Sequence, residues 1–195
     1  NDESKKLLLN KIERAGISLE TICDFTLGIT PYDKYKGHTK KQIEGRVFHS
    51  TFQKDPTYKP LLAGADVTKY FVQWSGAEYL SYGNWLAAPR DKKFFNQPRI
   101  LIRQIISGDP PCIYAAYTDE ELYNTQSIFN LVLKTEKSIN LKYLLGLLNS
   151  NLMNFYHRYR FLDVSKILFQ KILIQNCKKF PIVVDETKKQ EQLKI

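Results

Sequence analysis

The sequence predicts an α/β (α+β) fold: a strand-rich central mixed sheet with an N-terminal helix and a C-terminal amphipathic helical segment. Three observations lead to this prediction. The middle of the chain, residues 47–135, holds short β-branched and aromatic runs separated by Pro, Gly, Asp and Asn, a spacing typical of strands and turns. Near both ends, apolar residues recur at helical spacing instead. With 195 residues, 43% of them hydrophobic, the chain can bury a core without a disulfide or a metal.

The N-terminal segment predicts a helix followed by a strand. Its first apolar residues lie near helical spacing and Gly16 can end a helix, so we expect a helix over residues 3–15. Residues 17–29 are rich in β-branched and aromatic side chains, which favours a strand. The polar, lysine-rich stretch 30–46 is expected to form an exposed loop, and long loops inside compact domains are often functional.

The middle and the C-terminal part complete the expected order of elements. A helix is predicted over residues 139–156, capped by Asn140, because one apolar stripe runs along it. A second helix is expected over 163–175 and an edge strand over 180–184. The strand candidates in the middle are residues 47–52, 70–74, 85–88, 99–106, 113–117 and 128–133. The stripe consists of Leu141, Leu144, Leu145, Leu148, Leu152 and Phe155.

The formal charge of +9 is distributed unevenly. Residues 31–60 carry seven Lys or Arg against three Asp or Glu, and residues 141–195 carry ten against four. Residues 106–140 reverse the sign, with two against five. A basic chain with one acidic stretch predicts a positive face, which attracts phosphate backbones. The alternative is a solvated lysine surface without a partner.

Other classes of protein receive little support. No apolar run approaches the length that spans a bilayer, and no signal peptide opens the chain. The three cysteines, Cys23, Cys112 and Cys177, are scattered, which favours a reducing cytoplasm. The only methionine is Met153, so we expect a fragment of a larger polypeptide.

The sequence predicts neither a catalytic residue nor a metal site. Its histidines are not spaced as ligands, and phosphate-binding glycine loops and a serine nucleophile elbow are missing from it. One motif, Asp109-Pro110-Pro111-Cys112, is similar to the Asp/Asn-Pro-Pro-aromatic loop of methyltransferases that act on DNA bases. Cys112 offers no ring to stack on a base, however, and no glycine-rich turn precedes the motif. A proline-stiffened turn between two strands is therefore the favoured interpretation.

Candidate nucleic-acid contacts fall into several groups. Lysines can neutralise phosphates and a tyrosine can stack on a base, while arginine forks onto guanine and amide side chains onto adenine. Each group has a plainer alternative: a polar loop, a salt bridge on a half-exposed strand, or an Asx turn. Arg158 and Arg160 can instead grip another domain. The candidates are Lys34, Tyr35, Lys36, Lys40 and Lys41 in the basic loop, Lys69, the strand residues Arg99, Arg103 and Gln104, the polar residues Asn124 and Gln126, and the helical Arg158 and Arg160.

Two segments in a fixed order carry a resemblance to a known family. The first is Lys-Pro-x-Leu-x-Gly-x-Asp followed after three residues by Tyr, spanning residues 59–70, and the second is Leu-Leu-Gly-Leu-Leu-Asn-Ser over 144–150. From about residue 16 to 182 the chain resembles the TaqI-like C-terminal specificity domain, or target recognition domain, of adenine-specific DNA methyltransferases and fused restriction–modification enzymes. It departs from the family's Gly-x-x-Thr-Gly pattern, which appears here only as Gly-Ile-Thr-Pro over 28–31.

The resemblance implies a module that recognises a sequence in double-stranded DNA and performs no chemistry of its own. Residues 1–16 would connect it to an N-terminal methyltransferase domain, residues 17–184 would form the target recognition domain, and 185–195 a charged tail. The missing domain would bind S-adenosylmethionine, and this fragment would hold no cofactor. Base contacts vary between such modules, so none is transferred. Two alternatives stay open: a degenerate methyltransferase fragment that uses the Asp109 motif, and a protein–protein interaction module that exposes the leucine stripe.

Overall fold

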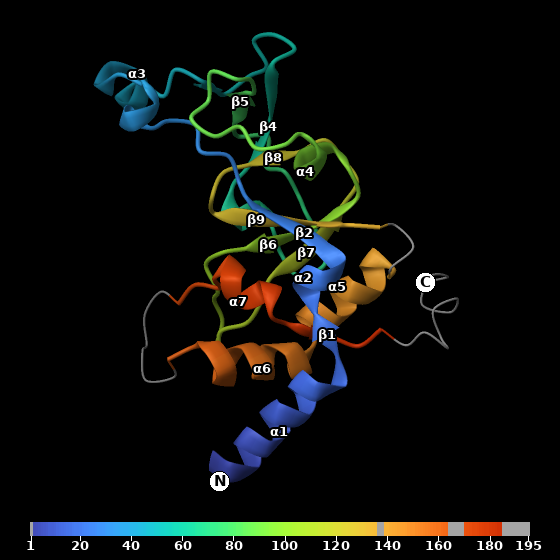
Figure 1. Ribbon diagram of the computed structural model, residues 1–195. Helices are drawn as coiled ribbons and strands as arrows, with labels where there is room; N and C mark the ends of the chain where they lie inside the picture. The colour runs from blue at the N-terminus through green and yellow to red at the C-terminus, as the bar shows by residue number, and fades with distance from the viewer. Residues whose placement is uncertain (1, 136–138, 164–169, 185–195) are drawn as a thin grey trace.

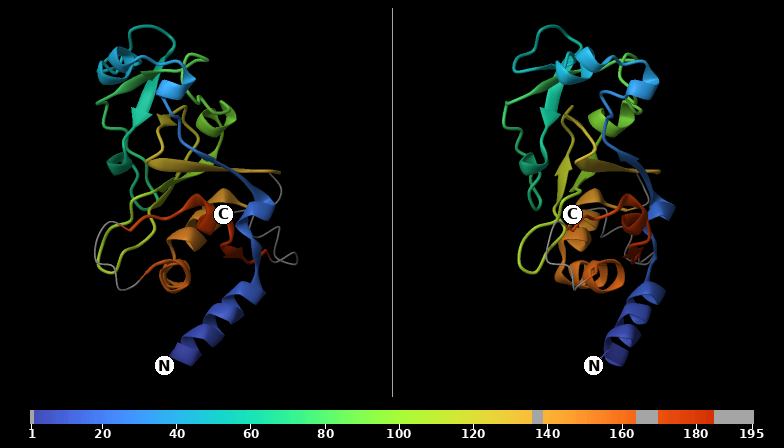
Figure 2. Two further views of the ribbon diagram at one scale, coloured as in Figure 1. Left: turned by 60° about the vertical axis from the view of Figure 1, so that its left-hand side comes forward. Right: turned by 90° about the vertical axis from the view of Figure 1, so that its left-hand side faces the viewer.

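A computed structural model describes residues 2–135, 139–163 and 170–184 of the chain (Figure 1). The molecule is elongated and has three layers. A small sheet with its loops lies at one end, a second sheet crosses the middle, and helices cover the far side of that second sheet. The helix α1 (Asp2–Ala15) projects from the helical end, which two further views confirm (Figure 2).

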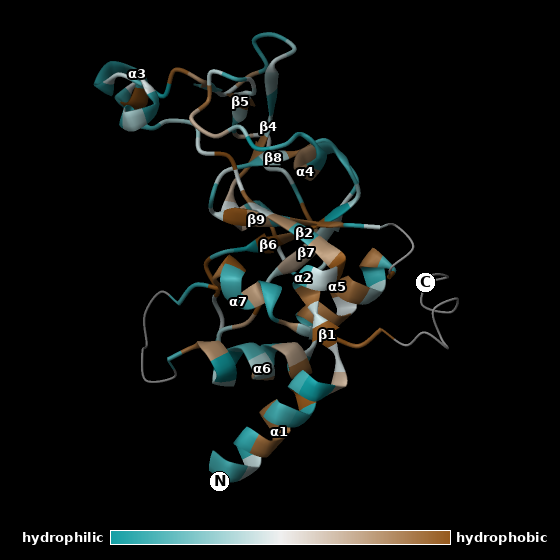
Figure 3. Cartoon of the chain, viewed as in Figure 1, coloured by the Kyte–Doolittle hydropathy of each residue, from teal (hydrophilic) through white to brown (hydrophobic). Residues whose placement is uncertain are grey.

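The central sheet is antiparallel and has the strand order β2-β9-β6-β7. Its strands are β2 (Cys23–Leu27), β9 (Ile128–Leu133), β6 (Arg99–Arg103) and β7 (Ala115–Thr118). The two inner strands, β9 and β6, are apolar nearly throughout because both faces of the sheet are covered. Figure 3 shows this hydrophobic colour in the middle of the molecule and hydrophilic colour on α3 and the outer loops. The strands predicted at 99–106, 113–117 and 128–133 are confirmed, with shorter bounds for the first.

Helices α5 (Leu141–Asn149) and α6 (Asn151–Phe161) occupy the predicted 139–156 segment, which is broken once. Asn140 caps α5 as expected, its Oδ1 accepting from the Lys142 N–H at 2.7 Å. The break follows from Asn149, whose buried amide accepts from the Ala115 N–H at 3.2 Å and donates to the Ala115 carbonyl at 2.9 Å. Ser150 then leaves the helical conformation and caps α6 through Met153.

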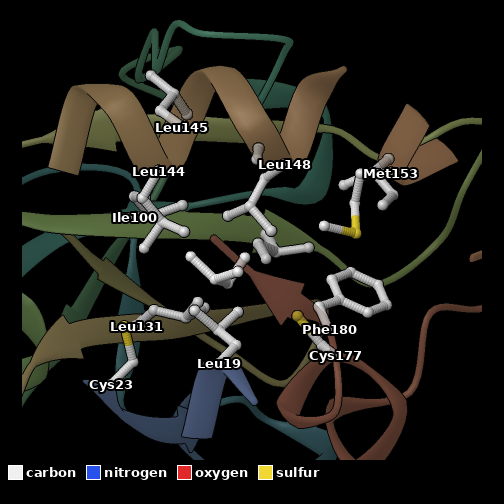
Figure 4. Packing of buried hydrophobic residues seen from close by; sticks show 14 of the residues in the cluster. Leu19, Cys23, Ile100, Leu131, Leu144, Leu145, Leu148, Met153, Cys177 and Phe180 are labelled. Carbon is white, nitrogen blue, oxygen red and sulfur yellow. The ribbon is translucent and has the colours of Figure 1, made fainter. Parts of the chain in front are cut away.

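The leucine stripe lies in the main core and is mostly buried (Figure 4). Leu144 and Leu148 are buried and point from α5 toward the sheet and Ile100, and Phe180 packs beneath them. Leu152 is the exception, with 56% of its surface exposed. The burial contradicts the interaction-module alternative, which required an exposed stripe. Residues of the central sheet, of α6, of α2 (Leu19–Ile22) and of α7 (Ile174–Lys178) also belong to this core.

The smaller sheet has the order β3-β5-β4-β8. Its strands are β3 (His49–Ser50), β5 (Tyr79–Ser81), β4 (Tyr58–Leu62) and β8 (Tyr123–Asn124), and β4 runs parallel to β8. A separate core of apolar side chains, including Phe95 from α4 (Lys93–Asn96), supports it. The 47–52 prediction is confirmed only at β3, and β4 and β5 were not predicted at all.

Two predicted strands and one predicted helix are wrong or incomplete. Tyr70 has a φ of 74°, so residues 70–74 form a turn with bridges rather than a strand. Residues 85–88 contribute only a bridge from Ala88 to Thr30. Within the predicted helix 163–175, residues 164–169 lie outside the described residues, residues 170–173 are not helical, and α7 begins at Ile174.

The segment that follows α1 pairs with the C-terminal strand of the described chain. β1 (Ile17–Ser18) pairs with β10 (Pro181–Ile182), which confirms a short version of the predicted edge strand. The α1 helix, predicted over residues 3–15, is confirmed and is tied to α6 through Glu13, which binds Arg160 at 2.9 Å and Tyr156 at 3.0 Å. Among the described residues, no helix is both long and apolar enough to cross a membrane.

Two glycines should respond oppositely to alanine. A Cβ on Gly28 would lie 1.9 Å from the Thr125 carbonyl oxygen, whereas a Cβ on Gly146 in α5 would meet nothing within 4 Å. We therefore expect Gly28→Ala to lower the free energy of unfolding by about 2 kcal/mol or more through overpacking. Gly146→Ala should raise it by about 0.5–1 kcal/mol, since alanine is the better helix former. Urea unfolding of both variants tests this, and equal stabilities would contradict the close approach at Gly28.

Candidate nucleic-acid interface

The predicted basic loop is folded into two short helical segments that present its cations. The 3-10 helix η1 (Lys34–Lys36) is capped by Asp33, whose carboxylate accepts from the Tyr35 N–H at 2.8 Å. The helix α3 (Lys40–Glu44) begins at Thr39 with a reciprocal capping box to Gln42. All five predicted contacts, Lys34, Tyr35, Lys36, Lys40 and Lys41, are exposed, and Tyr35 is 83% exposed.

A buried histidine anchors this loop to the rest of the small lobe, the end of the molecule formed by the smaller sheet and its loops. His38 is 9% exposed, and its Nε2 donates to the Trp85 carbonyl at 2.8 Å. Tyr32 stacks on Phe48 with a centroid distance of 5.1 Å and meets the His38 ring edge-on. These contacts hold the loop in one arrangement before any ligand binds. A pre-ordered loop loses less entropy when it binds.

Arg99 is not available to DNA, which corrects the prediction made for it. The side chain is fully buried, and its guanidinium donates to the carbonyls of Gln97, Glu120 and Leu122 at 3.0, 2.9 and 2.8 Å. Burial lowers the pKa of this guanidinium to about 10, so it is still charged at neutral pH. Arg99 and Arg103 lie four residues apart on one face of β6, and the strand is buried from Arg99 to Ile102, so only Arg103 is partly exposed.

Asn124, in β8 of the smaller sheet, is also buried, so its side chain has no exposed surface for the predicted contact with DNA. It is fully buried, and its Nδ2 donates to the carbonyls of Ile128 at 2.7 Å and Thr125 at 3.0 Å. The side chain thereby shapes the turn between β8 and β9. The plainer interpretation of this polar patch, a local turn stabilised by a side-chain amide, describes Asn124 correctly.

Three other predicted residues gather around that turn. The Gln104 N–H donates to the Ser127 carbonyl at 2.8 Å, and Gln126 is exposed and donates to the Thr30 hydroxyl at 2.7 Å. Arg103 is partly exposed, with its guanidinium 4.9 Å from the centre of the Tyr114 ring and 3.2 Å from the Ser107 hydroxyl. In Figures 1 and 2 the turn lies below α3 on the same side of the molecule.

The remaining predicted contacts lie elsewhere. Arg158 and Arg160 belong to α6, at the opposite end of the molecule from α3 (Figure 1). Arg160 is paired with Glu13, and Arg158 lies 5.6 Å from the Tyr159 ring centre. Arg160 therefore joins α6 to α1, and the ring contact of Arg158 stays within α6. Lys69 is partly exposed beside the turn at Tyr70.

Sequence reasoning missed a polar groove of about 470 Å³ in the small lobe. It lies where β4 and β8 end, and its lining includes Arg46, His49, Glu78 and the residues Thr125 and Ser127. The two strands are 60 residues apart in the sequence and become neighbours only through their parallel pairing. No local pattern in the sequence predicted that pairing.

The motif Asp109-Pro110-Pro111-Cys112 has a structural explanation. Asp109 and Pro110 are exposed, and the motif forms the turn between β6 and β7, closed by the Cys112 N–H donating to the Ser107 carbonyl at 3.0 Å. This is the proline-stiffened turn that the sequence favoured over a methyltransferase loop. Within the described ranges, no three His, Cys, Asp or Glu side chains gather closely enough to hold a metal ion.

Solved structures show the class of fold. The chain aligns over 99% of its length with 44% of a chain from a type I restriction–modification system, at 12% identity and a TM-score of 0.53. It also aligns over 98% of its length with 27% of the type IIG restriction endonuclease BpuSI, at 10% identity and a TM-score of 0.55. The fold is therefore one found within restriction–modification proteins.

The sequence identifies the family. Residues 59–182 match the TaqI-like C-terminal specificity domain, and the chain belongs to this family. It is also 28% identical over 171 residues to a Methanocaldococcus jannaschii protein named "Putative type II restriction enzyme and methyltransferase". That alignment covers 87% of this chain and 13% of the relative. The resemblance seen in the sequence is confirmed, and with it a recognition module of the restriction–modification type.

The reassignment of Arg99 can be tested against Arg103, four residues along the same strand. Arg99→Met leaves three backbone carbonyls without their donor, the Leu122 carbonyl in a buried contact, so we expect a loss of about 3 kcal/mol in the free energy of unfolding. Arg103→Met, at a partly exposed position, should cost about 1 kcal/mol or less. Urea unfolding measures both. Equal losses would return Arg99 to the list of surface candidates.

Proposed function

We propose that this chain recognises a target sequence in double-stranded DNA for an adenine-specific methyltransferase on the same polypeptide. The exposed lysines of η1 and α3, held on a capped and anchored frame, are the observation that carries the DNA-binding part. The β8–β9 turn, near Gln104 and Gln126, lies on the same side of the molecule as these lysines. Membership of the specificity-domain family supports the same reading.

In this proposal the lysines neutralise phosphates and set the position of the duplex. Lys34, Lys36, Lys40 and Lys41 carry four charges within eight residues, on two helical segments separated by Gly37. The Tyr35 ring, with the Lys34 ammonium 4.7 Å from its centre, can lie along the backbone or against a base. Sequence discrimination then falls to polar groups nearer the β8–β9 turn.

The phosphate contacts are tested by salt dependence. Lys34→Ala and Lys41→Ala should each weaken binding to every duplex and reduce the slope of log affinity against log salt by about one. Lys142→Ala is a matched control, because this exposed lysine lies on α5, far from α3. Fluorescence anisotropy with random-sequence duplexes, from low to physiological salt, gives the slopes. If both loop variants keep the slope of Lys142→Ala, the loop does not contact phosphates.

We assign the chemistry to a catalytic domain that binds S-adenosylmethionine, and we propose a cytoplasmic location for the whole protein. The chain spans only 13% of the length of the curated relative that it matches, which supports a larger parent. Two of the buried polar side chains, Arg99 and Asn124, make structural contacts to backbone carbonyls. All three cysteines are free, as a reducing compartment would keep them.

An apolar surface near α1 is the proposed contact with the catalytic domain. Leu8, Ile12, Leu152 and Val183 line a groove of about 290 Å³ between α1 and α6. Leu7 and Leu152 are 66% and 56% exposed, which is a large apolar surface to leave in water. This surface lies at the end opposite α3, so it leaves the DNA-binding side free (Figure 1).

This arrangement predicts the behaviour of separated parts. The catalytic part of the parent, produced alone, should methylate adenine in duplex DNA only weakly and should regain activity when this chain is added. Leu152→Asp should raise the concentration of chain needed for half-recovery about tenfold or more, because a carboxylate would be buried at the contact. Leu173→Asp, at another exposed leucine on the other side of the core, is the control. Recovery that is identical with both variants would contradict the proposed contact, and methylation of cytosine alone would contradict the adenine specificity.

A further inference from the structure

The polar groove of the small lobe is lined by small residues and by charged or polar side chains, so it can accept the hydrogen-bonding edge of a ligand. Because β4 and β8 are parallel, their carboxyl ends lie at one edge of the sheet. Ala63 and Gly64 follow β4, and Thr125 and Ser127 follow β8, and all four line the groove. These side chains are small or absent, so space is left above the backbone. The groove is also adjacent to Arg103, whose Cγ would lie 4.0 Å from a Cβ on Gly64.

The groove holds an arginine on a strained backbone. Helix α3 ends with the Arg46 N–H bonded to the Ile43 carbonyl at 3.2 Å and the Val47 N–H to the Gln42 carbonyl at 3.3 Å. This is the helix ending that normally places a glycine in the left-handed conformation. Here Arg46 occupies that position with a φ of 45°, although Gly45 stands immediately before it with a φ of −75°.

A side chain kept at a strained position points to a role for that side chain. The Arg46 guanidinium binds the Glu78 carboxylate at 2.7 Å across the groove wall, yet 58% of the arginine side chain is exposed. The carboxylate orients the planar guanidinium without enclosing it. The remaining N–H groups of the fork are therefore available to acceptors that enter the groove.

His49 places a second polar group in the groove. The Tyr32 hydroxyl accepts from the Phe48 N–H at 2.9 Å and lies 2.9 Å from the His49 Nδ1. In the tautomer in which Nδ1 accepts from Tyr32, the hydrogen of the neutral imidazole is on Nε2, which makes no hydrogen bond to any residue that the structure describes. Burial, with a further contribution from Arg46, lowers the pKa of His49, which keeps the ring neutral at pH 7.

We propose that this groove reads base edges, with the Arg46 guanidinium and the His49 Nε2–H as donors to purine acceptors and Glu78 as the residue that positions Arg46. The inference rests on the proposed function and adds to it the residues that discriminate sequence. Guanine offers N7 and O6 in the major groove, which is the pair of acceptors that an arginine fork matches. None of these three residues carries the non-specific affinity, which belongs to the lysine loop.

The test compares two variants that remove donors without removing packing. Arg46→Gly relieves the left-handed strain and deletes the fork, and His49→Phe keeps a ring against Tyr32, where the present centroid distance is 5.5 Å. A target duplex is first selected with the wild-type chain from a random-sequence library. Anisotropy then gives the affinity of each chain for the selected duplex and for a scrambled one, and thermal melting reports stability.

We expect each variant to lose about tenfold or more on the selected duplex and less than twofold on the scrambled one. Arg46→Gly should melt at or above the wild-type temperature, which a merely structural role would not produce. Ratios of selected to scrambled affinity within twofold of wild type in both variants would overturn the proposal. So would equal losses on both duplexes together with a lower melting temperature.

A result that contradicts the groove proposal can be told apart from a result that contradicts the proposed function. A wild-type chain that binds duplexes with a steep salt slope but selects no sequence would overturn the groove as a reader of bases and leave the lysine face in place. A wild-type chain that binds no duplex even at low salt would overturn the DNA-binding function itself, and the groove proposal with it.

Discussion

The buried Arg99 guanidinium joins the two sheets, and the candidate interface depends on that junction. Arg99 begins β6 in the central sheet, and two of its three carbonyl partners, Glu120 and Leu122, lie on the segment that enters β8 in the small sheet. Burial of a cation is costly unless it is hydrogen-bonded, and the two terminal nitrogens of Arg99 donate to three carbonyls while its Nε has no partner among the described residues. These bonds, together with the pairing of β8 with β4, fix the segment that leads into β8.

The polar residues fall into a buried set and an exposed set. Arg99, Asn124 and Asn149 are buried and bind backbone carbonyls between elements. The lysines of η1 and α3 are exposed and have no such task. Part of the positive charge is therefore exposed in the basic loop at one end, while the buried Arg99 serves the fold.

The side of the molecule that we propose to bind DNA is held in one arrangement by its own contacts. Capped helical segments, the His38 anchor and the Tyr32–Phe48 stack fix the loop, and the Tyr32 hydroxyl holds the His49 ring through Nδ1 at 2.9 Å. Backbone strain at Arg46 is the counterpart of this rigidity, since a strained conformation persists only where its surroundings determine it. The apolar groove at α1 lies at the other end of the molecule.

Local patterns in the sequence determined α1, the capped α5, the strands β6 and β9, the basic loop and the family, because periodicity, capping residues and ordered motifs are visible within short windows. Only the tertiary structure decided which polar residues face outward. Arg99 and Arg103 lie on one face of β6 like residues of a half-exposed strand, but the strand is buried from Arg99 to Ile102. The groove of Arg46 and His49 also escaped prediction, since it arises from the parallel pairing of β4 with a strand 60 residues later. Long-range pairing leaves no local signal, and sites built on it become visible only in the folded chain.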